Sequence, residues 1–278
     1  MKKNIIIMAL VALTLASCGE KNDTETASYT PPKDLVLESD IMTPEVLWSM
    51  NRLGEYAVSP DGKHVVYNLT YFNIAENKSK TDIYIIDIDG NNNRCLTKSF
   101  SNELSPTWNK DGSKILFMCA DSGDMQVWEM NPDGSERRQV SFVEGGVTGF
   151  KYSPDESQLL FTAEVKLKDN VADIYADLPL SSGRINNDLM YRHWDQWVDT
   201  FGHIFVTTDD GKTKRDIMEG EMWEAPVRPW GGMEQIAWTN DGENILYSCR
   251  KKIGMECNLN KYRYLPIQHS YWRMQEPH

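Results

Sequence analysis

Ser59-Pro60-Asp61-Gly62-Lys63-His64-Val65-Val66-Tyr67 decides the fold, because similar stretches recur along the chain. In each copy an unbroken apolar trio follows an Asp, and a large apolar residue stands three positions before it. The Asp residues at 61, 111, 155 and 241 lie 50, 44 and 86 residues apart, so the last interval predicts two periods with one degenerate copy between them. Repeats of about 40–50 residues are typical of propeller blades. The other copies span 109–117, 153–161 and 239–247.

The repeat unit predicts strands. Asp-Gly supplies the positive φ angles that a two-residue hairpin turn needs, and an apolar trio indicates a strand covered on both faces. Segments 81–87 and 125–130 are expected as third strands and 94–97 and 137–140 as outer strands, which gives four strands per blade. The predicted fold class is all-β, a partial β-propeller of about four to five four-stranded blades with a short helical insertion. The six Asp-Gly pairs begin at Asp61, Asp89, Asp111, Asp133, Asp210 and Asp241.

Composition narrows the range of functions. The chain has 278 residues, of which 40% are hydrophobic, and a formal net charge of −12. This hydrophobic content suffices for a folded core and is too low for a protein with many membrane spans. Because phosphate binding depends on clustered Lys and Arg, such acidity disfavours nucleic acid as a partner.

The N-terminal segment has the features of an export signal. Lys2 and Lys3 precede an apolar run from Ile5 to Leu15, which predicts a signal peptide over residues 1–17. Residues 18–40 are polar and without periodicity, so we expect a disordered tether. The propeller then spans 41–257 and begins with a short helix, capped by Thr43 with Pro44 at its first position.

Between Glu164 and Gly232 the repeat pattern is interrupted. Met190, Trp194 and Trp197 fall at helical spacing, which predicts a short amphipathic helix inserted into a blade. The strand 203–206 and the turn at Asp210 then restore the blade.

Two stretches resemble known families. Leu15-Ala16-Ser17-Cys18 resembles the bacterial lipoprotein cleavage box, which implies a lipid on Cys18 and an exported protein of the periplasm or outer membrane. Residues 192–197 (Arg-His-Trp-Asp-Gln-Trp), the strand 203–206 and the preceding 175–179 resemble the propeller half of prolyl oligopeptidase family serine peptidases, closest to dipeptidyl-peptidase V and acylaminoacyl-peptidase-like members. The similarity runs from about residue 42 to 256; the repeats alone also suit WD40-like and TolB-like propellers.

The family resemblance implies substrate-binding residues in the insertion. By similarity, Asp188 or Asp195 would hold a peptide's free amine and Arg192 a carbonyl, with His193 in the same candidate set. Packing of the insertion's aromatic residues against the next blade is the alternative. His193 and His203 are better interpreted as packing or hydrogen-bonding residues, because the sequence contains no nucleophile for them to activate.

Catalytic and metal motifs are missing from the sequence. The Gly-x-Ser-x-Gly turn that exposes an α/β-hydrolase nucleophile does not occur. We therefore assign no catalytic residue and expect the chain to be inactive alone. The stretch that begins at Asp87 fails the calcium-loop pattern, because Asn92 and Lys98 stand at the sixth and twelfth positions, where the pattern needs Gly and Glu. No Cys-x-x-Cys motif occurs in the sequence. We expect no metal or cofactor, and we expect Cys119 and Cys249 to be buried.

The last residues differ from the repeats. Residues 258–278 lack alternation and turn signals, and a one-base shift of reading frame can restore a blade-like strand there. We expect this tail to be out of frame and the C-terminal hydrolase domain to be missing. The predicted function is the peptide-gating and substrate-positioning propeller of a dipeptidyl or acylaminoacyl serine peptidase. The alternative is a non-enzymatic TolB-like periplasmic propeller that binds envelope proteins.

Overall fold

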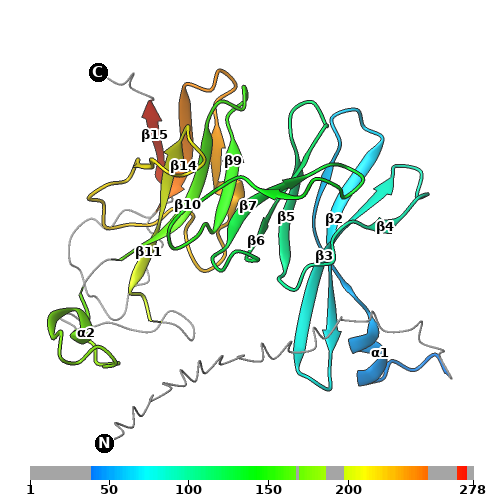
Figure 1. Cartoon of the computed structure of the whole chain (residues 1–278), viewed down its shortest axis with the longest axis horizontal. Helices are drawn as coiled ribbons and strands as arrows, with labels where there is room; N and C mark the ends of the chain where they lie inside the picture. Colours follow the sequence, from blue (N-terminus) through cyan, green and yellow to red (C-terminus); the bar gives the residue numbers. More distant parts are fainter. Residues whose placement is uncertain (1–38, 167–168, 186–196, 250–267, 274–278) are drawn as a thin grey trace, which may run out of the picture. The chain divides into compact units, whose positions relative to one another are not determined.

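Figure 1 shows the computed structural model, which describes residues 39–166, 169–185 and 197–249, and the backbone of 268–273. All of them belong to one unit, Pro31–His278. The predicted signal peptide, tether and Cys18 lie outside the described residues, apart from the last two tether positions. None of the helices in the described part of the chain is long and apolar enough to cross a membrane.

The described strands form four antiparallel sheets in chain order, which confirms the partial propeller. Three sheets have four strands, and the fourth has three among the described residues. The first sheet contains β1 (Arg52–Val58), β2 (His64–Asn73), β3 (Lys78–Asp87) and β4 (Arg94–Cys95); the second β5 (Glu103–Trp108), β6 (Ile115–Cys119), β7 (Gln126–Met130) and β8 (Arg138–Gln139); the third β9 (Gly149–Tyr152), β10 (Leu159–Lys166), β11 (Thr200–Thr207) and β12 (Arg215–Asp216); the fourth β13 (Ile236–Trp238), β14 (Asn244–Cys249) and β15 (Gln268–Arg273).

Neighbouring sheets pack through one repeated pair of faces. We call the face bearing the first and third residues of each apolar trio the rear face, and the opposite one the front face. Three hydrophobic clusters fill the junctions, and in each one the rear face of a sheet meets the front face of the preceding sheet. Both sides of the second strand are therefore buried in the two middle sheets, as the apolar trios predict. The front-face residues at the middle of the trios are Val66, Leu116, Leu160 and Leu246.

Hydrogen bonds between inner strands repeat as well. Trp108, the last residue of β5, donates its indole N–H to the carbonyl of Ala57 in β1 at 3.2 Å. Trp238, the last residue of β13, donates in the same way to Lys151 in β9 at 3.4 Å. In the second and fourth sheets, the Trp three positions before the Asp thus joins its own sheet to the sheet before it.

Five of the six Asp-Gly turns differ in type from the prediction; at Asp210-Gly211 both residues have positive φ, as a two-residue hairpin turn requires, and Lys212 N–H donates to the Asp209 carbonyl at 3.3 Å. All six glycines have positive φ, as expected. In the first repeat, however, Gly62 N–H donates to Ser59 at 2.8 Å, so Pro60 and Asp61 occupy the corners of the reverse turn and Gly62 follows them. The predicted two-residue hairpin turn is wrong here, because both of its corners, Asp61 and Gly62, would need positive φ and only Gly62 has it.

The long interval between the third and fourth repeats holds an insertion. Residues 167–199 stand between the second and third strands of the third sheet, where the described part includes α2 (Val171–Ile174). The described residues form no additional repeat there, so the predicted degenerate copy is replaced by this insertion. Most of the helix predicted around 188–197 lies outside the described residues.

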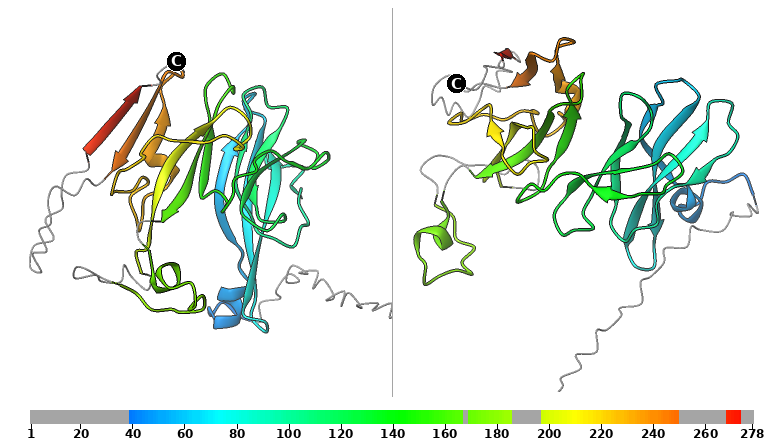
Figure 2. Two further views of the ribbon diagram at one scale, coloured as in Figure 1. Left: turned by 60° about the vertical axis from the view of Figure 1, so that its left-hand side comes forward. Right: turned by 45° about the horizontal axis from the view of Figure 1, so that its top comes forward.

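The remaining elements flank the sheets. Helix α1 (Pro44–Ser49) is capped by the Thr43 side chain, which accepts from Val46 N–H, as predicted. A 3₁₀ helix, η1 (Met233–Gln235), precedes β13. In the segment 258–278, expected to be atypical, Gln268–Arg273 forms β15 beside β14. The tip of the β2–β3 hairpin, α1 and α2 lie at the end of the sheets away from the Asp-Gly turns (Figures 1 and 2).

Candidate functional site

The predicted site residues fall on a segment that the structure leaves undescribed. Asp188, Arg192, His193 and Asp195 lie within residues 186–196, outside the described part of the chain. The structure does describe where the insertion leaves and rejoins the third sheet. In the register of β10 and β11, Lys166 is opposite Thr200 and Glu164 is opposite Gly202. The insertion therefore starts at the sheet end away from the Asp-Gly turns.

Charged side chains hold the described parts of the insertion. Asn170 and Asp173 form a capping box at α2, and Asp173 forms an ion pair with Lys166 at the end of β10. Arg184, before the undescribed segment, pairs with Asp199 after it. Arg184 also lies over the Trp197 ring, 5.1 Å from its centroid. The flanks of the predicted site are thus fixed to each other and to the sheet.

A small cavity of about 200 Å³ lies beside this strand pair. Glu164 and Arg228 are its charged residues, and Nη1 of Arg228 lies 3.8 Å from Oε2 of Glu164. Nε of Arg228 pairs with Glu224 at 2.7 Å, and Nη2 donates to the carbonyl of Thr200 at 2.5 Å. A carboxylate and an oriented guanidinium therefore share one cavity wall. Its other lining residues include Thr148, Thr162, Gly202 and Met233.

Sequence reasoning did not single out Glu164 or Arg228. The one available signal was a carboxylate inside the apolar strand β10, since the residues from Leu159 to Ala163 are all buried. Arg228 carried no comparable signal, because its segment 217–235 is largely irregular.

His203 is a buried structural residue, as predicted. Its side chain is 3% exposed, and Nδ1 lies 2.8 Å from Oδ2 of Asp216. Asp216 belongs to β12, the outer strand paired with β11. This hydrogen bond joins the two strands and uses the imidazole nitrogen nearest the backbone.

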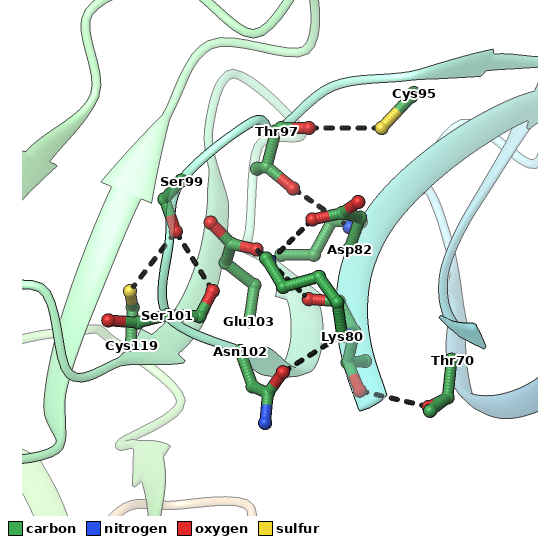
Figure 3. A network of polar contacts seen from close by, with 12 residues as sticks. Thr70, Lys80, Asp82, Cys95, Thr97, Ser99, Ser101, Asn102, Glu103 and Cys119 are labelled. Atoms are coloured by element: carbon green, nitrogen blue, oxygen red, sulfur yellow. Dashed lines mark hydrogen bonds and ion pairs between the residues drawn. The ribbon is translucent and has the colours of Figure 1, made fainter. Parts of the chain in front are cut away.

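A second group of charges is buried between the first two sheets (Figure 3). Glu103 is fully buried, and its Oε2 accepts from Nζ of Lys80 at 2.9 Å. Lys80 also pairs with Asp82 at 2.6 Å. Arg137 approaches the other Glu103 oxygen at 3.4 Å and pairs with Asp121 at 2.7 Å. Burial raises the pKa of Glu103, against the hydrogen bonds and the Lys80 charge that lower it. These contacts serve to join the sheets.

A larger groove of about 520 Å³ follows the inner strands of the first three sheets. Its walls are mixed, with Tyr56, Trp108 and Phe150 among the aromatic residues. Lys151 also lines it, and its ammonium donates to the carbonyl of Ile236 at 2.6 Å. Burial lowers the pKa of Lys151. Within the described residues, no cluster of His, Cys, Asp and Glu is suited to hold a metal ion.

Comparisons with known proteins agree with this architecture. Residues 45–186 match the family model of the TolB beta propeller domain. The chain is 47% identical over 222 residues to dipeptidyl-peptidase 5 of Porphyromonas gingivalis, covering 79% of this chain and 32% of that protein. It is 38% identical over 271 residues to dipeptidyl-peptidase 5 of Porphyromonas endodontalis, covering 94% of this chain and 38% of that protein. The chain thus spans about a third of the length of these relatives.

Solved structures show the same fold. An acylaminoacyl peptidase in complex with Z-Gly-Gly-Phe-chloromethyl ketone superposes with a TM-score of 0.56 at 14% identity, covering 83% of this chain and 32% of that one. The uncomplexed acylaminoacyl peptidase of Pyrococcus horikoshii gives a TM-score of 0.54 at 15% identity, covering 81% and 31%. At these identities the likeness concerns the fold alone.

Proposed function

Because this chain belongs to the TolB β-propeller domain family and is similar to dipeptidyl-peptidase 5 over about a third of that protein, we propose that it positions peptides for a dipeptidyl-type serine peptidase. The observation that carries the proposal is the high identity to the Porphyromonas gingivalis relative over most of this chain. The parent reaction would release dipeptides from peptide N-termini.

The cavity beside the insertion supports this function. A peptide's N-terminal ammonium pairs well with a carboxylate, and a guanidinium donates well to a carbonyl or carboxylate. Glu164 and Arg228 offer these two groups on one wall. In this proposal Asp188 or Asp195 adds a second carboxylate from the insertion, Arg192 holds a carbonyl, and His193 contributes a hydrogen bond.

Peptide binding tests the role of Glu164. The purified chain is titrated with a tripeptide that has a free amine and with its N-acetylated form. We expect the free-amine peptide to bind more tightly, and Glu164→Gln to weaken it about 10-fold, as the loss of a charge-assisted hydrogen bond predicts. Glu243→Gln, in a turn at the opposite end of the sheets, is the matched control. Equal affinity for both peptides would contradict the proposal that Glu164 pairs with the peptide's free amine.

A hydrolysis assay tests whether catalysis needs the part of the peptidase that this chain does not cover. The 278 residues contain no Gly-x-Ser-x-Gly, so we expect the purified chain to release no chromophore from dipeptidyl substrates. Fusion to the remaining two thirds of a dipeptidyl-peptidase 5 is expected to give turnover that Glu164→Gln reduces through KM. Turnover by the 278-residue chain alone would contradict the proposal.

The family match also favours a second function. TolB-type propellers form the family to which residues 45–186 belong, so a non-enzymatic scaffold that binds envelope proteins is the alternative. Affinity capture with the purified chain separates the two. A specific, stoichiometric envelope protein together with no peptide binding would favour the scaffold.

The N-terminal segment supports an exported, lipid-anchored protein. The basic start, the apolar run and Cys18 at the expected cleavage point carry this proposal. We expect metabolic labelling with a radioactive fatty acid to mark the chain, and Cys18→Ser to abolish the label and release the protein from the periplasmic or outer membrane fraction. A labelled Cys18→Ser chain would exclude this anchor.

A further inference from the structure

The cavity of Glu164 and Arg228 lies where the apolar packing between the third and fourth sheets ends. On β10, Glu164 follows Leu160 by four positions and so lies on the same front face. Its partner in the strand register is Gly202, which has no side chain. Met233 packs against the apolar cluster of this junction and also lines the cavity. The cavity is therefore a break in the packing at the insertion end of the junction.

The corresponding end of the first junction is filled. Thr70 stands there at the position of Glu164 and pairs with Thr81, and their hydroxyls bond each other at 2.9 Å. The chain that enters the second sheet adds Asn102, whose side chain accepts from Thr81 N–H at 2.9 Å, and the fully buried Glu103. The third sheet thus has a charged residue opposite a glycine where the first sheet has a hydrogen-bonded pair.

Arg228 has hydrogen-bonding capacity left for a ligand. Its guanidinium carries five N–H donors, of which Nε–H bonds Glu224 and one Nη2–H bonds the carbonyl of Thr200. Within the described part of the chain the other three have no hydrogen bond, and two of them are on Nη1. Nη1 lies 3.8 Å from Oε2 of Glu164, which is beyond hydrogen-bond distance. A ligand can therefore bond to both charged groups at once.

We propose that this cavity binds a free, neutral α-amino acid, with its ammonium on Glu164 and its carboxylate on Arg228. In an α-amino acid a single Cα joins the ammonium nitrogen to the carboxylate carbon, which places the two about 2.5 Å apart. This spacing matches two protein charges that are 3.8 Å apart. Each additional residue adds about 3.5 Å to an extended chain, so the two ends of a dipeptide match the pair less well.

The size and the lining of the cavity restrict the ligand further. About 200 Å³ is less than the roughly 300–1,000 Å³ of sites for drug-sized ligands, so the ligand is small. The hydroxyls of Thr148 and Thr162 bond each other at 2.8 Å. No other charged residue of the described part lines the cavity, which favours an uncharged side chain on the ligand. The rest of the lining is Gly202, Pro226, Gly231, Gly232 and Met233.

A free amino acid at this site competes with a peptide. The competition rests on the proposed function, in which a peptide's N-terminal ammonium pairs with Glu164. Because both ligands need the same carboxylate, free amino acids reduce peptide binding as their concentration rises.

Isothermal titration calorimetry of the purified chain with L-alanine tests the site. L-Alanine methyl ester lacks the carboxylate, and N-acetyl-L-alanine lacks the ammonium. We expect L-alanine to bind at least about 10-fold more tightly than either derivative, because each derivative loses one charge-assisted hydrogen bond. L-Alanine that does not bind, or that binds no more tightly than the two derivatives, would overturn the proposal.

A pair of arginine variants tests the carboxylate contact. We expect Arg228→Gln to weaken L-alanine binding at least about 10-fold. Arg138→Gln is the matched control, since Arg138 pairs with Glu129 at the surface of the second sheet, and it should bind L-alanine as the wild type does. Circular dichroism confirms folding. An unchanged affinity in folded Arg228→Gln would contradict the assignment.

Gly202→Ala tests the cavity without changing a charge. Among the described residues, a Cβ at Gly202 would meet only the carbonyl oxygen of Ala225, at 3.6 Å. It lies on the same face as the Glu164 side chain, so it takes up space inside the cavity. We expect L-alanine binding to weaken while the fold is kept, and this variant carries the test if Arg228→Gln unfolds. Wild-type affinity in Gly202→Ala would place L-alanine elsewhere and overturn the proposal.

A tripeptide amide separates this site from the proposed function, because it has a free amine and no carboxylate. Binding of the tripeptide amide without binding of L-alanine would exclude the amino-acid site and leave the proposed function standing. Binding of L-alanine alone would support the site and count against the proposed function. Where both bind, we expect L-alanine to raise the apparent Kd of the tripeptide amide in proportion to its own concentration. An apparent Kd that L-alanine leaves unchanged would mean separate sites and would overturn the proposal.

Discussion

At the scale of single residues, the fold depends on a polar pattern that begins each repeat. Ser59 donates its hydroxyl to Asp61 at 2.6 Å and accepts from His64 N–H at 2.9 Å. Asp61 accepts in turn from Lys63 N–H. The other three repeats form the same bonds, with Asn109, Ser153 and Thr239 in place of Ser59. A short polar residue two positions before Asp is therefore part of the turn.

Gly62→Ala tests the backbone requirement of this turn. Gly62 has φ 71° and open space where a Cβ would lie, so the substitution adds backbone strain and no clash. We expect the free energy of unfolding to fall by about 1 kcal/mol, measured by urea denaturation. Gly202→Ala is the control, since its backbone φ is not positive and its Cβ would meet Ala225 at an ordinary 3.6 Å. Equal effects of both substitutions would contradict this interpretation.

The turn carboxylates predict a response to acid. Hydrogen bonds from Ser153 and Ser157 lower the pKa of Asp155 to about 2. A lowered carboxyl pKa contributes stability that is complete above the unfolded value of about 4 and is lost as pH falls towards about 2. We expect Ser153→Ala to raise the Asp155 pKa in an NMR titration. Ser113→Ala, which removes a hydroxyl beside Asp111, should leave Asp155 unchanged; an Asp155 pKa insensitive to Ser153 would contradict the assignment.

At the residue scale, the sequence predicted which residues form the turns and which cysteines are buried, but not the type of most turns. The positive φ of all six Asp-Gly glycines and the burial of Cys119 and Cys249 were predicted correctly. The two-residue turn was predicted correctly at Asp210-Gly211, where both corners have positive φ, and wrongly at the other five Asp-Gly pairs, whose Asp does not. Pro60 at the preceding position was the signal for the longer turn.

At the scale of elements, neighbouring turns contact one another, and this explains an irregular repeat. A Cβ at Gly112 would lie 3.3 Å from Pro60, and one at Gly242 would lie 3.5 Å from Pro154. Between the second and third sheets, Lys110 stands at the Pro position and Glu156 at the Gly position. There the Glu156 carboxylate accepts from Lys110 N–H at 2.6 Å, and Glu156 takes a φ of 60°. A hydrogen bond replaces the Pro–Gly contact.

A double-mutant cycle tests this exchange. We expect Glu156→Gly to lose the hydrogen bond while relieving the strained φ, and Lys110→Pro to remove the donor. In the double variant the Pro–Gly contact of the other junctions should form. The predicted coupling free energy is about 1 kcal/mol in favour of the double variant, from urea denaturation of all four chains. Strictly additive effects would contradict the proposed pairing of turns.

The buried charges between the first two sheets predict a large loss of stability when one of them is removed. Glu103→Gln leaves Lys80 and Arg137 without their shared carboxylate in a buried setting. We expect the free energy of unfolding to fall by about 3 kcal/mol, as for other broken buried ion pairs. Glu136→Gln is the matched control, because Glu136 pairs with Lys114 at the surface and should change stability by less than about 1 kcal/mol. If Glu103→Gln lowers the free energy of unfolding no more than Glu136→Gln does, the buried ion pairs of Glu103 do not stabilise the fold.

The candidate site was predicted less completely than the sheets. Helical spacing and family resemblance indicated the insertion, and its position within a blade is confirmed. Its proposed residues, Asp188, Arg192, His193 and Asp195, remain predictions. Glu164 and Arg228 come together only through the pairing of β10 with β11 and the irregular segment before β13, and sequence spacing carries no information on such contacts.

At the scale of the whole molecule, a single interaction surface is repeated from sheet to sheet. The spacing of the repeats predicted this arrangement because each blade must bury its faces against its neighbours. The same spacing misled at the longest interval, where an insertion of 33 residues resembles an additional repeat in length alone. Length cannot distinguish the two; the apolar trio that starts four positions after the Asp of a true repeat can.

A crystal structure of the 278-residue chain tests the central claim most directly. The account predicts four successive antiparallel sheets, with Phe117, Phe161 and Tyr247 each packed on the front face of the preceding sheet and with the insertion leaving between β10 and β11. A ring closed within one chain, or a core in which these three rings do not lie between neighbouring sheets, would contradict it.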